Sequence, residues 1–383
     1  MKKRLSRTPI AGMVGTIVCL CHCCEHRLLA NEGNANIIQQ IGNKWKSREK
    51  KFRSGRLIWN VHHTFVRGSI SLNDPQLPVL PPEDLSFEAP LSLLFDGDKT
   101  KYSAKWKLWR NKENDLVDYE IIRGFDGERS LEYVPTPEAR GYPAGVIRSP
   151  KTVTPYLFDQ VLPLTLTIRP FMLERRGFQI GNSTILNTKA IVDDDVCYII
   201  QNRPESTNEK TVAVWVNPTK DFAIVGYAEM LKNVVLLKID IDYSNNPKFG
   251  WIPKQWRINK LNRDGSVRET SRGTVADLVY NLDIPASEFQ ISFPSGTLVE
   301  DQMTDSKNNP PNYIVKDDGK RLILPEEYGE SYHDILTSET GEAGKRSPSK
   351  FVSTSVFAFV VLSLLGGYFV WKYRKRSGCQ SPL

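Results

Sequence analysis

The chain has 383 residues, 40% of them hydrophobic, and a formal net charge of +7. Five basic residues and one carboxylate lie within residues 1–30 and four basic residues within residues 372–383, so the part between carries a net charge of about −1. The positive charge therefore belongs to the two ends of the chain, and nucleic acid is set aside as a partner.

Residues 1–30 are predicted to be a signal peptide. A basic start, Met1 to Arg4, is followed by an apolar stretch from Ile10 to Cys24, and Ala30 ends a plausible cleavage site. An uncleaved signal anchor is the alternative, because the end of this stretch is unusually polar. Four of the six cysteines lie in this segment, which leaves Cys197 alone in the exported body and predicts no disulfide framework there. Cys197 is predicted to be a buried strand residue.

Residues 31–324 are predicted to form one exported, β-rich region. Apolar residues recur at helical spacing from Ala35 to Phe52, which predicts an amphipathic helix, and alternation from Leu57 to Val66 predicts a strand. The proline-rich stretch from residue 73 to residue 90 is predicted to be an extended surface excursion. A short helix that stops near Pro163 is expected midway.

The remainder of this region has the alternating pattern of antiparallel strands. Residues 101–110 place Tyr102, Ala104, Trp106 and Leu108 on one face and lysines on the other. Hairpins are expected around Asp126-Gly127, within residues 183–202 and, as the last hairpin, around Asp264-Gly265. Two β-branched runs, residues 210–229 and 233–243, supply further strands.

The C-terminal part reads as a membrane anchor. Residues 325–350 are rich in Glu, Ser, Gly and Thr and predict a flexible tether. Residues 351–371 contain no charged side chain and are long enough for a transmembrane helix. The basic residues that follow predict a cytoplasmic tail at residues 372–383, with the bulk of the chain on the exported side.

No catalytic constellation is evident, so the chain is expected not to be an enzyme and to need no metal or other cofactor. His62 and His63 are adjacent and would point to opposite faces of a strand, which prevents them from sharing a metal ion. The acidic runs at residues 193–195 and 240–242 lack the pattern of an EF-hand calcium loop. An unrecognised hydrolase is kept as a third hypothesis, without a nucleophile that can be named.

The strands carry more large apolar side chains than a single sheet with one wet face requires. One interpretation is an ordinary core between a sheet and a helix, and the other is a concave apolar cavity for a ligand. Under the second interpretation, the residues expected to line the cavity are Trp59, Phe65, Trp106, Trp215, Phe222 and Trp256.

Several stretches resemble the lipoprotein-carrier superfamily of LolA, LppX and RseB type, and most of all the LolA-like proteins of planctomycete-type bacteria. The stretches are residues 43–65, 123–129, 215–229, 251–267 and 284–302, and "YIVKDDGK" from residue 313. The resemblance implies an α+β fold in which a strongly curved, incompletely closed antiparallel sheet, a half-barrel, is covered by helices and accommodates acyl chains.

This resemblance, combined with the anchor, predicts a function. The chain is expected to be a non-enzymatic domain that binds lipid, lipoprotein acyl chains or another apolar ligand, anchored in the bacterial inner membrane with its body in the periplasm. The alternative is an RseB-like sensor or regulatory domain that acts on a membrane-protein partner. A short tether and a membrane span would prevent the free shuttling of a soluble carrier.

Overall fold

The computed structural model describes residues 32–68, 83–110, 115–137, 141–149, 158–192, 194–202, 210–303, 312–323, 327 and 330–337. The predicted signal peptide, membrane span and cytoplasmic tail lie outside these residues, and their boundaries stay predictions. Among the helices that the structure describes, none is both long enough and apolar enough to cross a membrane.

The chain divides into two compact units, one that ends at Phe293 and one that begins at Pro294. The first unit contains two α-helices and thirteen strands among its described residues. They are α2 (Glu32–Lys51), β1 (Ser54–Phe65), β2 (Leu85–Asp96), β3 (Lys99–Arg110), β4 (Asp115–Phe125), β5 (Ser130–Val134), β6 (Ala144–Arg148), α4 (Leu162–Ile168), β7 (Ser183–Val192), β8 (Asp195–Asn202), β9 (Lys210–Asn217), β10 (Ala223–Leu231), β11 (Val234–Asn246), β12 (Gly250–Leu261) and β13 (Val267–Tyr280).

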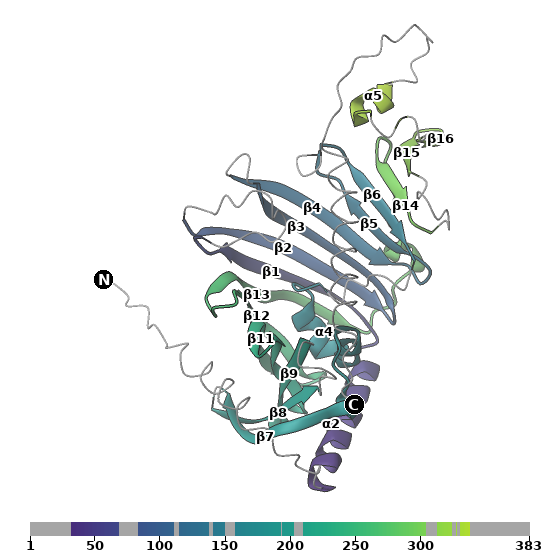
Figure 1. The fold of residues 1–383 in the computed structure, drawn as a ribbon. Coiled ribbons are helices and arrows are strands. Elements are labelled where there is room, and N and C mark those ends of the chain that lie inside the picture. Colours follow the sequence, from purple (N-terminus) through teal and green to yellow (C-terminus); the bar gives the residue numbers. More distant parts are fainter. Residues whose placement is uncertain are drawn as a thin grey trace, which may run out of the picture. The chain divides into compact units, whose positions relative to one another are not determined.

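These strands form a large, open and curved antiparallel sheet, with α2 and α4 beside it (Figure 1). The order across the sheet is β6-β5-β4-β3-β2-β1-β13-β12-β11-β10-β9-β8-β7. Strands that follow one another in the sequence are neighbours in the sheet, except that β6 and β7 are not, and β1 pairs with β13 as well as with β2. The sheet therefore consists of two meanders joined through β1.

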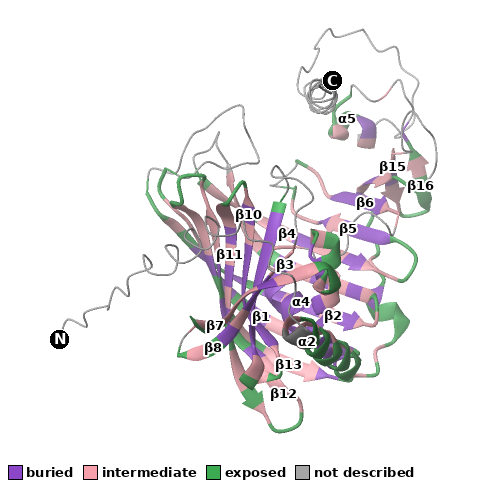
Figure 2. Ribbon diagram, turned by 60° about the horizontal axis from the view of Figure 1, so that its bottom comes forward, coloured by how far each residue is buried: buried purple, intermediate pink, exposed green. Residues whose placement is uncertain are grey.

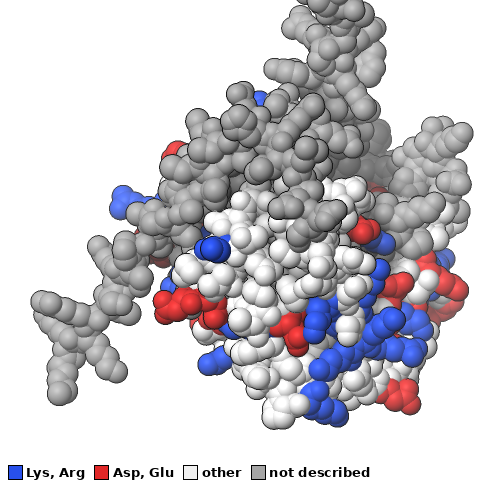
Figure 3. All heavy atoms as spheres, turned by 90° about the horizontal axis from the view of Figure 1, so that it is seen from below, with Lys and Arg blue, Asp and Glu red and all other residues white. Residues whose placement is uncertain are grey.

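Helix α2 packs an apolar stripe against the sheet and leaves a basic face outside. Ile41, Trp45 and Phe52 are buried in the main core, as helical spacing requires. Lys46 and Lys50 are exposed on the other side. In the view from below, Lys and Arg side chains gather in one patch of the surface (Figure 3). The amphipathic helix predicted from residue 35 to residue 52 is confirmed.

Helix α4 lies between the sheet and α2, and all of its residues are buried (Figure 2). Its hydroxyl groups have partners there: Thr167 Oγ1 donates to the carbonyl of Pro163 at 2.9 Å. The prediction that this helix stops near Pro163 is wrong. Pro163 lies in the first turn, where its fixed φ suits a helix and its missing N–H has no intrahelical acceptor.

The predicted hairpins are confirmed as β4–β5, β7–β8 and β12–β13. Two strands of the first unit were missed. The end of the proline-rich excursion, residues 85–90, belongs to β2, and β6 is too short to show a period. The hairpin around Asp264-Gly265 is not the last, because the second unit has three more strands.

The second unit is small in the part that the structure describes. It contains β14 (Leu298–Asp301), β15 (Asn312–Lys316), β16 (Gly319–Leu322) and the short helix α5 (Tyr332–Thr337). The strands pair antiparallel in that order. Ile314, Ile323 and Ile335 form its buried core. Helix α5 lies in the segment whose composition predicts a tether and shows no helical period.

Candidate functional site

The first unit contains a cavity of about 510 Å³. It lies on the face of the sheet that carries residues of β1, β3, β4, β12 and β13, and the stretch Phe158–Gln160 before α4 contributes to its wall. The lining residues are His63, Phe65, Tyr102, Ala104, Trp106, Leu108, Trp109, Tyr119, Ile121, Arg123, Phe158, Asp159, Gln160, Lys260, Arg268 and Glu269. Strands β3 and β4 supply mostly aromatic and aliphatic side chains, together with Arg123, whose guanidinium lies 4.2 Å from the centre of the Phe158 ring. Asp159, Lys260, Arg268 and Glu269 make the other side charged.

The apolar side follows from the alternation of β3. Tyr102, Ala104, Trp106 and Leu108 are two residues apart and share one face of the sheet, as predicted. The ring of Phe158 lies 6.0 Å from that of Tyr102, between centroids, so the stretch before α4 continues the same surface.

Strand β3 stops pairing with its neighbour β2 beside this cavity. Pairing of β2 with β3 runs from Asp96 to Leu91 and goes no further, although β2 stays paired with β1 as far as Leu85. Pro90, which has no N–H to donate, stands where the pairing stops. The apolar face of β3 beyond Ala104 thus turns toward the cavity instead of continuing a closed sheet.

His63 lies at the back of this apolar side. It is only 2% exposed, and its ring lies 4.9 Å from that of Trp106 and 5.2 Å from that of Phe87. Its Nδ1 is 2.7 Å from Ser271 Oγ, which also accepts a hydrogen bond from Gln160 Nε2 at 3.1 Å. Burial lowers the pKa of His63 to about 3, with contributions from the Lys260 and His62 charges, so the imidazole is neutral at pH 7.

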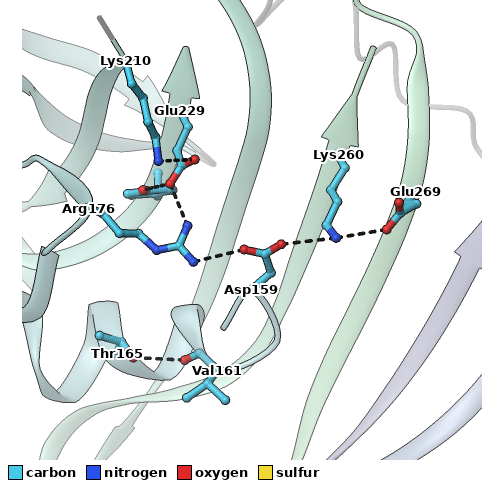
Figure 4. A network of polar contacts seen from close by, with 9 residues as sticks. Asp159, Val161, Thr165, Arg176, Lys210, Glu229, Lys260 and Glu269 are labelled. Carbon is cyan, nitrogen blue, oxygen red and sulfur yellow. Dashed lines mark hydrogen bonds and ion pairs between the residues drawn. The ribbon is translucent and has the colours of Figure 1, made fainter. Parts of the chain in front are cut away.

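The charged side of the cavity is one end of a network of ion pairs (Figure 4). Lys260 Nζ on β12 lies 3.2 Å from Asp159 Oδ2 and 3.1 Å from Glu269 Oε2. The network continues through Arg176, whose guanidinium lies 3.1 Å from Asp159 and 2.8 Å from Glu229. It therefore ties the segment around α4 to three strands of the sheet.

Asp159, Lys260 and Glu229 stay ionised although they are largely buried. Burial alone would raise the pKa of Asp159, but the Lys260 and Arg176 charges outweigh it and hold the pKa below its usual value. Burial likewise disfavours the charged form of Lys260, yet Glu269 and Asp159 raise its pKa above the usual value. Glu229 has a lowered pKa, mainly because the Lys210 and Arg176 charges offset its burial.

The six residues predicted to line a ligand cavity lie in different parts of the first unit. Phe65 and Trp106 line the cavity described above. Trp59 and Trp256 are buried in the main core, where their rings lie 6.1 Å apart. Trp256 is pressed against Gly273, where an added Cβ would lie 2.2 Å from Trp256 Cε2. The space beside these two rings is therefore filled.

The other two predicted residues lie elsewhere in the sheet. Trp215 belongs to a second apolar cluster with Cys197 and Ala213, while its neighbours Val214 and Val216 belong to the main core. Because β9 alternates, Trp215 faces the opposite side of the sheet. Phe222 follows the end of β9, and its carbonyl accepts a hydrogen bond from Trp45 Nε1 at 2.9 Å.

The sequence reasoning missed most of the lining. The alternation of β3 was a usable signal, because it places Tyr102 and Leu108 beside Trp106. Phe158, Gln160 and Arg268 come from a loop and a strand end, where no periodic pattern marks them. Among the described residues, no group of three or more His, Cys, Asp or Glu side chains is arranged to hold a metal ion. Cys197 is a buried strand residue, as predicted.

No protein-family model matches the chain, and no curated protein does. Solved structures do resemble it. A putative outer membrane lipoprotein-sorting protein domain from Vibrio parahaemolyticus has 11% identity and a TM-score of 0.40, over 67% of this chain and 97% of that one. A LolA superfamily protein from Nitrosomonas europaea has 13% identity and a TM-score of 0.37, over 66% and 97%.

A lipoprotein-sorting protein domain and a LolA superfamily protein are among the solved structures to which this chain is similar. The MucA/MucB complex from Pseudomonas aeruginosa is a more distant likeness, with 11% identity and a TM-score of 0.24 over 72% of this chain and 74% of that one. At such scores the comparisons carry no argument about function, which has to come from the cavity itself.

Proposed function

We propose that the chain is a non-enzymatic binding domain that holds the acyl chain of a lipid or of a lipoprotein in the cavity beside β3. The aromatic and aliphatic side of the cavity is the observation that carries this proposal. Its volume of about 510 Å³ lies within the range of roughly 300–1,000 Å³ typical of small-molecule sites.

The contacts favour a flexible apolar ligand. Trp106 and Leu108 lie on the same face of β3 and form a continuous apolar strip with Tyr102. An acyl chain that lies along this strip removes apolar surface from water on both partners, which stabilises a complex by about 25 cal/mol per Å² buried. No hydrogen bond is needed along this strip. The strip therefore does not distinguish one hydrocarbon tail from another.

The location belongs to the same proposal. The basic start of the chain and the apolar stretch at residues 351–371 support export of the body to the periplasmic face of a bacterial inner membrane, with a single C-terminal span as its anchor. Such a domain would bind its ligand next to the membrane from which a lipid leaves. A domain of this kind is a tethered binder instead of a free carrier.

Photo-crosslinking tests the proposed cavity. The full chain, reconstituted in phosphatidylcholine nanodiscs, is irradiated with a diazirine-bearing palmitate, and labelled peptides are mapped by mass spectrometry. We expect labels on residues 102–109 and on the peptide that contains Phe158. Leu108→Glu should reduce this labelling at least tenfold, because it places a carboxylate on the apolar strip of the cavity.

The matched control is Lys105→Glu, which makes a similar change at an exposed residue on the opposite face of the same strand. It should leave the labelling unchanged. Equal labelling of both variants and of the wild type, or labels spread evenly over the surface, would contradict the proposal. Crosslinking of the domain to one specific membrane protein, without labels in the cavity, would favour the regulatory alternative instead.

A further inference from the structure

Arg268 enters the cavity because of an irregularity in β13. The register of β12 with β13 pairs Lys260 with Glu269 and Leu261 with Val267, so Arg268 is an extra residue opposite no partner. In a regular strand, neighbours point to opposite faces, and Arg268 would then face away from Glu269. Such a bulge re-aims a side chain, and both residues line the same cavity.

The guanidinium of Arg268 has few hydrogen-bond partners in this position. The side chain is only 14% exposed, and its nearest charged neighbour is Glu269, with 3.3 Å between Nε and Oε1. Its Nε is buried without a hydrogen bond, and no side-chain hydrogen bond of Arg268 is found within the described residues. Its Nη1 and Nη2 groups are not fully buried, so their N–H donors are open to a ligand in the cavity.

Glu269 does not neutralise Arg268 alone, because it also pairs with Lys260 at 3.1 Å. The described ion pairs that run from Lys210 to Arg268 contain four basic side chains and three carboxylates. The network therefore has one positive charge in excess among these residues. That excess fits one singly charged anion at the end where Arg268 lies.

We propose that Arg268 binds the acidic headgroup of the ligand, which makes the ligand an amphiphile with a single negative charge, a carboxylate or a phosphodiester. The acyl chain then lies on the apolar strip of β3, and the headgroup lies toward the charged side of the cavity. This inference rests on the proposed function and narrows it from apolar ligands in general to acidic amphiphiles. Planar guanidinium groups suit both kinds of oxygen pair.

Two photo-probes that differ only in the headgroup test this assignment. The full chain in phosphatidylcholine nanodiscs is labelled either with the diazirine palmitate or with the corresponding diazirine fatty alcohol. We expect the wild type to take up palmitate about tenfold better than the alcohol, because a charge-assisted hydrogen bond is available only to the carboxylate. Arg268→Gln should lower palmitate labelling to the level of the alcohol and leave alcohol labelling unchanged.

Arg268→Lys and Arg272→Gln are the matched variants. The lysine keeps the charge but not the fork of donors, so it should retain part of the preference. Arg272 is exposed on the same strand, and its substitution should change nothing. Equal loss of both probes in Arg268→Gln would indicate a structural role and overturn the inference, as would an equal uptake of both probes by the wild type.

A competitor without a chain separates an amphiphile site from a small-anion site. Acetate at millimolar concentration should not reduce palmitate labelling, because it lacks the contact with the apolar strip. Protection by acetate as effective as that by unlabelled palmitate would overturn the assignment to an amphiphile. Failure of both photo-probes to label the wild-type cavity would overturn the proposed function and, with it, this inference.

Discussion

His63 and His62 are adjacent on β1 and have opposite environments. His62 is exposed and lies 2.7 Å from Glu88 Oε1, whereas His63 is enclosed by aromatic rings on the cavity side. The alternation of a strand is sufficient to produce this difference. The imidazole of His63 is neutral in the folded protein but takes up a proton in the unfolded chain at mildly acidic pH. This difference couples folding to pH.

We expect His63 to make the protein less stable as the pH falls. The pKa of His63 is lowered from 6.5 to about 3, so between these values the unfolded state binds more protons than the folded state. The contribution of His63 to the free energy of unfolding is therefore fully present above pH 6.5 and is lost as the pH falls toward 3. Between pH 7 and pH 5 the loss should be about 2 kcal/mol.

Urea unfolding, followed by tryptophan fluorescence at pH 7 and pH 5, measures this loss. His63→Gln should remove about 2 kcal/mol of the difference between the two pH values. A wild type and a His63→Gln variant that lose the same free energy between pH 7 and pH 5 would contradict the expected neutral state of the buried imidazole.

At the scale of elements, two arginines join the ends of α2 and α4. Arg48 of α2 donates from Nε to the carbonyl of Thr167 in the last turn of α4, at 2.5 Å. Arg169, just after α4, donates to the carbonyl of Glu49 in the last turn of α2 at 3.1 Å. It also donates to the carbonyls of Phe52 and Arg53, just after α2, at 2.7 Å and 2.8 Å. The last carbonyls of a helix have no intrahelical donor, so each arginine satisfies the end of the other helix.

Arg169→Met should therefore destabilise the protein by about 3 kcal/mol, because it leaves several buried carbonyls without a donor. The free energy of unfolding in urea at pH 7 measures the effect. Arg175→Met is the control, since Arg175 is exposed in the 3-10 helix Pro170–Arg176 and should change stability by less than about 0.5 kcal/mol. Similar losses in both variants would show that the carbonyl contacts of Arg169 contribute little.

The elements themselves were largely predictable where a period is long. The pattern from Leu57 to Val66 and the turn residues Asp264-Gly265 predict β1 and the β12–β13 hairpin, because alternation and turn chemistry are local. Pro90 made β2 hard to recognise as a strand. In the structure it ends the pairing of β2 with β3 but not the pairing of β2 with β1. Helix α4 is buried on all sides, so its sequence has no exposed polar face that marks its bounds.

The candidate site was predictable only in part. Phe65 and Trp106 could be chosen from their strands, but which apolar face becomes a cavity depends on where the β3–β4 hairpin leaves β2. The ring of Trp256 packs into the space that Gly273 on the neighbouring strand leaves by having no side chain. The sequence cannot show that these two residues are neighbours before the strand register is known. The role proposed for Arg268 depends on one extra residue in β13, and nothing in the local sequence marks it.

At the scale of the whole molecule, the predicted anchor can be tested by extraction. The full chain, produced in bacterial cells, should stay with the membrane pellet in alkaline carbonate, because residues 351–371 are long enough to span the hydrocarbon core. A chain that ends at Lys350 should move to the supernatant. Release of the full chain by carbonate would contradict an integral anchor.

The central place of β1 has a consequence for how the chain folds. Phe65 on β1 pairs with Glu269 on β13, so the first strand to be made meets its second partner only about 200 residues later. Contacts so distant along the chain slow folding. The meander β2–β6 can form beside β1 soon after synthesis, whereas the meander β7–β13 joins last, through β13. Until then β1 is an open edge, and that edge must stay covered while the remainder of the chain is made.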